Sequence, residues 1–252
     1  MLRTPAIVCV LRELSISKAL TALRCGADAV ELRLDLFKPE EREATRVKAF
    51  VEALREKAKA GVILTNRSAS EGGKFEGSED ERLSLLKEAL EASEADAVDV
   101  EYFAEPRKRA EIVALSRKLN ATVIFSFHDF AGMPDAAELE HLALKMHAEG
   151  ADIAKIAVTP KTAEDALKLL ELTLKLKASK ASKASKAGKG EVAGEKGVAF
   201  IGMGSVGRHL RVLAPIYGSA LTYGFLEGEE SVAPGQLSIS ELRSMIDKLS
   251  MS

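Results

Sequence analysis

Residues 122–158 read TVIFSFHDFAGMPDAAELEHLALKMHAEGADIAKIAV and contain one complete unit of the repeat that decides the fold. Two apolar runs, Thr122–Phe127 and Ile153–Val158, flank a helical stretch, Glu138–Glu149. Near-continuous apolar runs are typical of strands buried on both faces, and parallel strands need a crossover connection that is usually a helix. The unit is therefore predicted to be a strand, a covering helix and a second parallel strand.

The same alternation continues along the chain, with helical spacing of apolar residues in Arg46–Lys59, Glu81–Glu91 and Ala163–Leu176. Eight strands and eight helices in strict alternation predict a single-domain α/β fold, a (β/α)8 TIM barrel over residues 1–252. A doubly wound open sheet is the alternative. The expected strands are Ala6–Val10, Ala29–Leu34, Val62–Thr65, Val98–Tyr102, Thr122–Phe127, Ile153–Val158, Val198–Gly202 and Ala220–Tyr223.

Composition narrows the possible partners. The 252 residues are 46% hydrophobic and carry a net charge of −2, so a core can form and no basic field favours nucleic acid. No apolar run approaches the roughly 18 residues of a membrane span, and the N-terminus lacks a secretory signal pattern. We expect neither a nucleic-acid nor a membrane partner, and we expect the protein in the cytoplasm.

One segment interrupts the alternation. Lys175–Gly190 reads KLKASKASKASKAGKG and opens a low-complexity Lys/Ala/Ser insertion at about residues 175–196. It is predicted to be a solvated extension of the preceding helix, and a basic patch for an anionic partner is the alternative. Helix-to-strand connections of a barrel lie on the face away from catalysis, where insertions are tolerated.

Charged residues gather at the expected carboxyl ends of the strands, where barrel enzymes place their active sites. Alternation sends Glu31, Arg33 and Asp35 to one face of the second strand. Charges inside a barrel are costly unless they are paired or used. The later strands add Arg67 and Glu71, Asp99 and Glu101, His128, and Lys155.

Lys155 and His128 are the strongest candidates for chemistry. Lys155 lies within an otherwise apolar strand, and removing an ammonium from water favours the neutral, nucleophilic amine. The alternative is a structural lysine paired with an acid such as Glu31 or Glu101. His128 ends a strand beside Asp129 and suits general acid–base catalysis, although a lone histidine is more often structural.

Gly202–Gly207 fits the pattern GxGxxG after a strand, and Glu227 follows twenty residues later. Alone, this pattern indicates a dinucleotide site, which would make the protein an NAD(P)-dependent dehydrogenase. The position of the motif at the seventh strand weighs against this interpretation, because only one strand is left to build a nucleotide-binding sheet. Such a loop can instead hold a carboxylate, with Arg211 as a bidentate partner. The long loop Gly224–Gln236 is a candidate lid.

In this order, the motifs at successive strand ends closely resemble those of the type I 3-dehydroquinate dehydratases, from Ile7 to Met245 with Lys175–Gly197 excluded. The matching segments are Glu31–Asp35, Arg67–Gly73, Ser126–Phe130, Asp152–Val158, Gly202–Gly204 with Arg211, Gly218–Gly224 and Ala233–Gln236.

The resemblance implies a lyase that dehydrates 3-dehydroquinate through a lysine Schiff base, the third step of the shikimate pathway to chorismate and aromatic amino acids. It implies that Lys155 forms the Schiff base, that His128 is the acid and base, and that Glu71 orients His128. It implies no cofactor and no metal, a small-molecule substrate as partner, and a homodimer. The implied substrate-binding residues are Glu31, Arg33, Arg67, Arg211, Gln236, Met203, Tyr223 and Ser231.

Two features depart from the family pattern. Val232 stands where the family often has a lid serine, with Ser231 beside it, and Tyr223 stands where the family usually has Phe. A class I aldolase-type Schiff-base enzyme remains the main alternative, because such enzymes share a barrel with a lysine on its sixth strand.

The chain is also depleted in heat-labile amides: it has Asn66, Asn120 and Gln236 and no other Asn or Gln. Together with abundant Lys, Glu and Arg, this resembles hyperthermophile composition. Calorimetry should therefore give a melting temperature well above the roughly 45–65 °C of mesophilic domains, and melting within that range would contradict the prediction.

Overall fold

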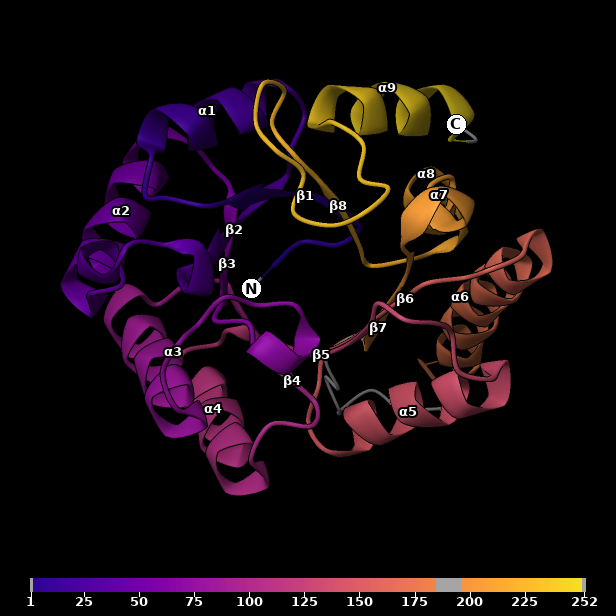
Figure 1. Ribbon diagram of the computed structural model, residues 1–252, viewed down its shortest axis with the longest axis horizontal. Coiled ribbons are helices and arrows are strands. Elements are labelled where there is room, and N and C mark those ends of the chain that lie inside the picture. Colours follow the sequence, from indigo (N-terminus) through magenta and orange to yellow (C-terminus); the bar gives the residue numbers. More distant parts are fainter. Residues whose placement is uncertain (1, 185–195, 251–252) are drawn as a thin grey trace.

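Eight parallel strands stand around a common axis, with the helices outside them (Figure 1). The computed structural model describes residues 2–184 and 196–250. The strands pair in the order β7-β6-β5-β4-β3-β2-β1-β8, and the Ala220 amide donates to the Val198 carbonyl oxygen (2.7 Å) where β7 and β8 meet. The strands are β1 Ala6–Leu11, β2 Ala29–Arg33, β3 Gly61–Thr65, β4 Ala97–Glu101, β5 Thr122–Asp129, β6 Ile153–Val158, β7 Gly197–Gly202 and β8 Leu221–Gly224.

The predicted (β/α)8 barrel is confirmed, and the open-sheet alternative is wrong. Each expected strand matches an observed strand to within two residues at either end. The helices are α1 Ile16–Arg24, α2 Ala44–Lys57, α3 Glu79–Ser93, α4 Pro106–Lys118, α5 Ala136–Ala148, α6 Ala163–Ala184, α7 Gly204–Gly207, α8 Leu210–Tyr217 and α9 Ile239–Leu249, with short 3-10 turns η1 Leu34–Leu36, η2 Pro39–Glu41 and η3 Ala69–Glu71.

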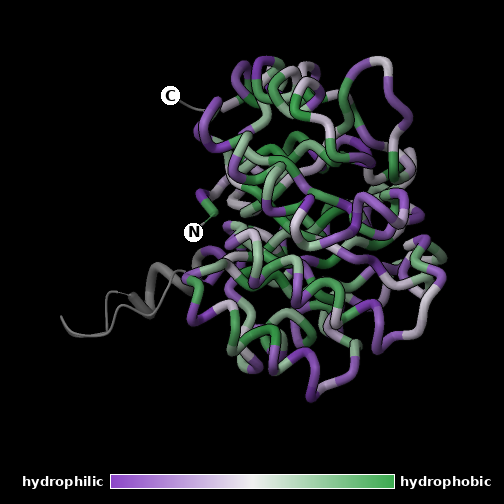
Figure 2. Tube along the Cα trace, turned by 90° about the vertical axis from the view of Figure 1, so that its left-hand side faces the viewer, coloured by the Kyte–Doolittle hydropathy of each residue, from purple (hydrophilic) through white to green (hydrophobic). Residues whose placement is uncertain are grey.

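Apolar side chains form two separate layers of core. One fills the space between strands and helices, and the other fills the barrel interior. The trace in Figure 2 is hydrophobic in the interior and hydrophilic on the outer turns. Within the barrel the inward positions change character along each strand, because alternate residues share a face. Ile63, Ala97 and Ile124 close the amino-terminal end with apolar groups. The next inward residues towards the carboxyl ends, such as Thr65 and Asp99, are polar or charged.

The Gly202–Gly207 motif serves packing. A Cβ atom on Gly207 would lie 2.4 Å from the carbonyl carbon of Gly202, so the two glycines let α7 pack directly against the end of β7. Gly204 has a φ of 71°, and its amide donates to the Pro234 carbonyl oxygen (3.2 Å). The motif therefore joins the seventh strand to the lid.

Helix α6 runs to Ala184 and so includes the first part of the insertion at 175–196. Residues 185–195 lie outside the described residues, so the remainder of that segment stays a prediction. Within residues 2–184 and 196–250, no helix combines the length and apolar character of a membrane span.

The close contact at Gly207 predicts a stability effect. Gly207→Ala should lower the free energy of unfolding by about 1–3 kcal/mol, because the added methyl group overlaps Gly202. Urea denaturation measures this effect. Gly132→Ala is the matched control, since a Cβ there would meet nothing within 4 Å. Equal stability of the two variants would contradict the packing role.

Candidate active site

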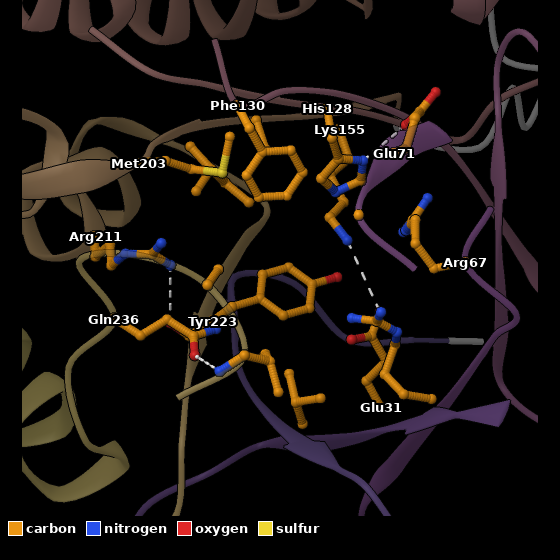
Figure 3. Close-up of a pocket in the computed structure, with 17 residues that line it drawn as sticks. Glu31, Arg67, Glu71, His128, Phe130, Lys155, Met203, Arg211, Tyr223 and Gln236 are labelled. Atoms are coloured by element: carbon orange, nitrogen blue, oxygen red, sulfur yellow. Dashed lines mark hydrogen bonds and ion pairs between the residues drawn. The ribbon is translucent and has the colours of Figure 1, made fainter. Parts of the chain in front are cut away.

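A pocket of about 530 Å³, part of it open to solvent, lies at the carboxyl ends of the strands (Figure 3). It collects almost all of the predicted site residues from across the chain. Ser231 is the exception: its side chain is exposed and does not line the pocket, whereas Val232 does. The predicted residues that line it are Glu31, Arg33, Arg67, Glu71, His128, Lys155, Met203, Arg211, Tyr223 and Gln236.

Lys155 lies in the middle of β6, and the residue is 4% exposed. Its Nζ donates to Asp99 Oδ2 at 2.8 Å and lies 3.8 Å from Glu31 Oε1. The ring of Tyr223 lies against the same nitrogen, 4.2 Å from Nζ to the ring centroid. Of the two acids expected as alternative partners, Glu31 is the one near Lys155, whereas Glu101 is paired with Arg67 and Arg82. Asp99 is the closer acid.

Arg67 organises the acids around Lys155. Its guanidinium is buried and donates to Asp99 Oδ1 (2.8 Å), Glu101 Oε1 (2.9 Å) and the Ser126 hydroxyl (2.6 Å). Glu101 is also paired with Arg82 at 2.8 Å. These carboxylates hold the pKa of Arg67 above its usual range despite burial. The guanidinium therefore neutralises buried acids as well as lining the pocket.

The second strand ends earlier than expected. Asp35 was expected to extend the inward face of the strand, but it lies in η1 after β2 has ended at Arg33. It still faces Arg33, which donates to both of its carboxylate oxygens at 2.8 Å. Asp35 also accepts from the amides of Arg67 and Lys74, both at 3.1 Å, so it joins the ends of β2 and β3. This arrangement keeps the Arg33 side chain at the pocket wall.

Glu71 reaches His128 because of a tight turn. Gly72 has a φ of 80°, and a Cβ on Gly73 would lie 2.0 Å from the Arg67 carbonyl oxygen, so both positions require glycine. The turn places Glu71 Oε2 at 2.9 Å from Nδ1 of His128. The histidine ring stacks on Phe130 with a centroid separation of 6.4 Å. His128 is therefore held by a carboxyl group on one side and an aromatic ring on the other.

Burial determines the protonation states of His128 and Glu71. Desolvation lowers the pKa of His128 well below its ordinary value, and the positive charges of Arg67 and Lys155 lower it further. Desolvation raises the pKa of Glu71 to about 8, assisted by the acids Glu101 and Asp99. Below about pH 8 the Glu71 carboxyl keeps its proton; above it, the ionised carboxylate accepts a hydrogen bond from Nδ1–H of the neutral imidazole and leaves Nε2 free as a base. One proton of the His128–Glu71 pair is therefore exchangeable around pH 8, which suits acid–base catalysis.

Arg211 is a buried cation that lacks an acidic partner among the described residues. Its Nη atoms donate to the carbonyl oxygens of Tyr223 (3.3 Å) and Pro234 (3.2 Å), and Nε makes no hydrogen bond. Burial lowers its pKa to about 10. A desolvated guanidinium at a pocket wall is well suited to an anionic group of a ligand.

The lid crosses one side of the pocket. Gln236 Oε1 accepts from the Val232 amide (2.9 Å) and closes the turn that also contains Gly235. Two ion pairs join this loop to residues after β1: Lys18 to Glu229 at 2.6 Å and Arg12 to Glu230 at 3.1 Å. In Figure 1 the loop between β8 and α9 lies over the ends of β1 and β8. The lid is therefore held over the pocket in this structure.

No three His, Cys, Asp or Glu side chains are grouped to hold a metal ion within residues 2–184 and 196–250. The pocket instead combines a buried amine with an acid–base pair at the mouth of a (β/α)8 barrel. This combination of fold and site is typical of the barrel enzymes that act through a lysine Schiff base.

Comparison with known proteins identifies the family. The family profile for type I 3-dehydroquinase matches residues 7–252. The 3-dehydroquinate dehydratase of Methanosarcina mazei is 38% identical over 250 residues, covering 97% of this chain and 94% of that protein. The Bacillus subtilis enzyme is 34% identical and covers 88% of this chain and 81% of its own. The crystal structure of 3-dehydroquinate dehydratase from Geobacillus kaustophilus superposes with a TM-score of 0.79 at 28% identity, covering 97% and 91% of the two chains. The chain belongs to the type I 3-dehydroquinase family.

Sequence reasoning missed the contact between Asp99 and Lys155. The signal was present, because Asp99 precedes Glu101 by two residues and therefore faces the same interior. Phe130 was also missed as a lining residue, although it lies two positions after His128.

The raised pKa of Glu71 predicts a pH effect on stability. The folded chain holds this proton up to about pH 8, whereas the unfolded chain releases it near the ordinary carboxyl pKa. The stabilisation is thus present at low pH and is lost as the pH rises towards 8. The free energy of unfolding of the wild type, relative to Glu71→Gln, should fall between pH 5 and 8, by at most about 1.4 kcal/mol per pH unit. Denaturation curves at several pH values measure this difference. A difference in the free energy of unfolding between the wild type and Glu71→Gln that does not change with pH would contradict the prediction.

Proposed function

We propose that this chain is a hydro-lyase that converts 3-dehydroquinate to 3-dehydroshikimate through a Schiff base on Lys155. The observation that carries the proposal is the convergence on a single pocket of one buried lysine, one histidine–glutamate pair and one buried arginine that has no acidic partner among the described residues. A carboxylated hydroxyketone needs these three functions together: an amine for its ketone, an acid–base group for its dehydration and a cation for its carboxylate.

Lys155 would begin the reaction. Its neutral amine attacks the ketone carbon, the carbonyl oxygen leaves as water, and a protonated imine remains. Dehydration beside a ketone is difficult because negative charge develops on the neighbouring carbon. The cationic imine accepts that electron pair, so the step draws its electron sink from the covalent intermediate itself.

His128 would carry out both proton transfers. It removes a proton from the carbon next to the imine, and the electron pair moves to the imine nitrogen to form an enamine. The enamine then expels the hydroxyl group, which takes the proton back from His128 and leaves as water. Hydrolysis of the product imine consumes a water molecule and frees Lys155. Glu71 would keep His128 in the orientation that suits both transfers.

The remaining pocket residues would bind substrate. Arg211 would hold the carboxylate, which supplies the negative charge that its buried guanidinium lacks. Met203 and the Tyr223 ring would form the apolar wall, and Phe130 would extend it beside His128. The hydroxyl groups would contact polar side chains on the other walls, namely Glu31, Arg33, Arg67 and Gln236.

We further propose that the enzyme works in the cytoplasm as a homodimer. The support is the family membership, since a shikimate-pathway enzyme acts on small soluble metabolites. Size-exclusion chromatography with light scattering tests the dimer.

The activity itself is tested by absorbance. Mixing the protein with 3-dehydroquinate should produce the conjugated-enone absorbance of the product. Lys155→Met should reduce turnover by at least about 10⁴-fold, because the covalent route is removed altogether. Arg211→Met should chiefly raise KM, since it removes a binding group. A pure wild-type protein with no enone absorbance across pH and temperature would contradict the proposal, and an aldol cleavage product would favour the aldolase alternative.

A further inference from the structure

The nitrogen of Lys155 lies in a site shaped for a positive charge. Asp99 Oδ2 is 2.8 Å away, Glu31 Oε1 is 3.8 Å away, and the face of the Tyr223 ring is 4.2 Å away. Carboxylates and aromatic faces both attract cations, and the attraction is stronger where water is excluded. Such surroundings suit the ammonium of the free lysine and also the cationic imine that replaces it.

Of the three residues around the Lys155 nitrogen, Asp99 is fixed in place by further hydrogen bonds. It is 1% exposed, and its other oxygen, Oδ1, accepts hydrogen bonds from Arg67 (2.8 Å) and Ser126 (2.6 Å). Three donors, from the segment after β3, from β5 and from β6, thus hold the two oxygens of one carboxylate on β4. Arg67 and Lys155 hold the pKa of Asp99 well below its usual range, despite burial. Asp99 therefore stays ionised when Lys155 loses its proton.

We propose that Asp99 is the permanent counter-ion of the Lys155 nitrogen, a positioning residue that aims the amine in the free enzyme and stabilises the cationic imine of the covalent intermediate. The inference deepens the proposed function and rests on it only for the identity of the carbonyl substrate. It assigns no proton transfer to Asp99: the proton that leaves the lysine is taken up by solvent water in the open pocket, and the carboxylate keeps its charge throughout.

This role has two opposing effects on the reaction. Before the covalent step, the carboxylate favours the ammonium and so delays formation of the nucleophile as the pH rises. After that step, it favours the imine over the free carbonyl compound. Removing the charge should therefore let imine formation begin at lower pH and make the imine less stable.

Other charges also face this nitrogen, and they would remain in an Asp99 variant. Glu31 on β2 is the other nearby acid, Arg33 and Arg67 contribute positive charge from β2 and from the segment after β3, and the neutral His128 ring lies nearby on β5. Tyr223 on β8 presents its ring, and its buried hydroxyl has no hydrogen-bond partner in the described part of the chain. Because these groups are the same in the wild type and in an Asp99 variant, a comparison of the two proteins isolates the effect of the Asp99 carboxylate on the Lys155 nitrogen.

The test is the pH dependence of imine trapping in Asp99→Asn. Cyanoborohydride reduces a Lys155 imine to a stable secondary amine, which peptide mass mapping quantifies. One series uses 3-dehydroquinate, and a second uses formaldehyde, which requires no dehydratase activity. In both series the pH of half-maximal trapping should fall by about one unit or more in the variant. Turnover of 3-dehydroquinate should fall about tenfold or more, because the imine loses its counter-ion.

Two further variants control for structural damage. Ser126→Ala keeps the Asp99 charge but removes one hydrogen bond to Oδ1, so it should keep the wild-type pH midpoint and lower turnover severalfold. Asp152→Asn removes a carboxylate that accepts from the Val123 amide, just before β6 at the opposite end of the barrel. It should keep the wild-type midpoint.

The outcomes separate this inference from the proposed function. Coincident trapping curves for the wild type and Asp99→Asn with formaldehyde would overturn the counter-ion role. A wild type that is trapped by formaldehyde but not by 3-dehydroquinate would overturn the proposed function and leave the Asp99 comparison intact. If Asp99→Asn does not fold, unchanged turnover in Ser126→Ala would overturn the positioning role.

Discussion

The buried guanidinium of Arg67 is the interaction on which the rest of this site depends. It connects the carboxylates of β4 with the hydroxyl of Ser126 on β5, and its own backbone amide binds Asp35. Burying a charge is costly, and removing one partner of a buried pair typically destabilises a protein by about 3–5 kcal/mol. Because Arg67 neutralises Asp99 and Glu101, the barrel can keep these acids in its interior, and Asp99 can hold Lys155.

The chemistry follows from a gradient along the barrel axis. The amino-terminal part of the interior is filled by apolar side chains, which seal the barrel below the pocket. Towards the carboxyl ends the same inward positions carry paired charges, and at the mouth lies Arg211, whose charge no acid compensates within residues 2–184 and 196–250. The paired charges form a rigid frame, whereas the charge of Arg211 is available to a ligand. Lys155 belongs to this frame through Asp99 and also lines the pocket, so the frame positions the reactive amine.

The barrel fold and the position of the pocket were predictable from the sequence, because both depend on local sequence patterns. Apolar runs alternating with helical spacing predicted the barrel, and the charged residues at strand ends predicted the pocket. The pairing inside the pocket was not predictable in the same way. Whether Lys155 meets Asp99, Glu31 or Glu101 depends on strand stagger and on which acids Arg67 and Arg82 occupy. Likewise, the lid conformation, rather than spacing, places Val232 at the pocket and turns Ser231 to solvent.

The glycines show how a local motif can mislead until packing is known. Gly202 and Gly207 fit a dinucleotide pattern, yet their contact serves the junction of β7 with α7. The central claim concerns Lys155 instead, and its most direct measurement is the site of covalent capture. Borohydride reduction during turnover of 3-dehydroquinate, followed by peptide mass mapping, should give one adduct, on the peptide that contains Lys155. Turnover without a trapped adduct, or an adduct on a different lysine, would contradict the account.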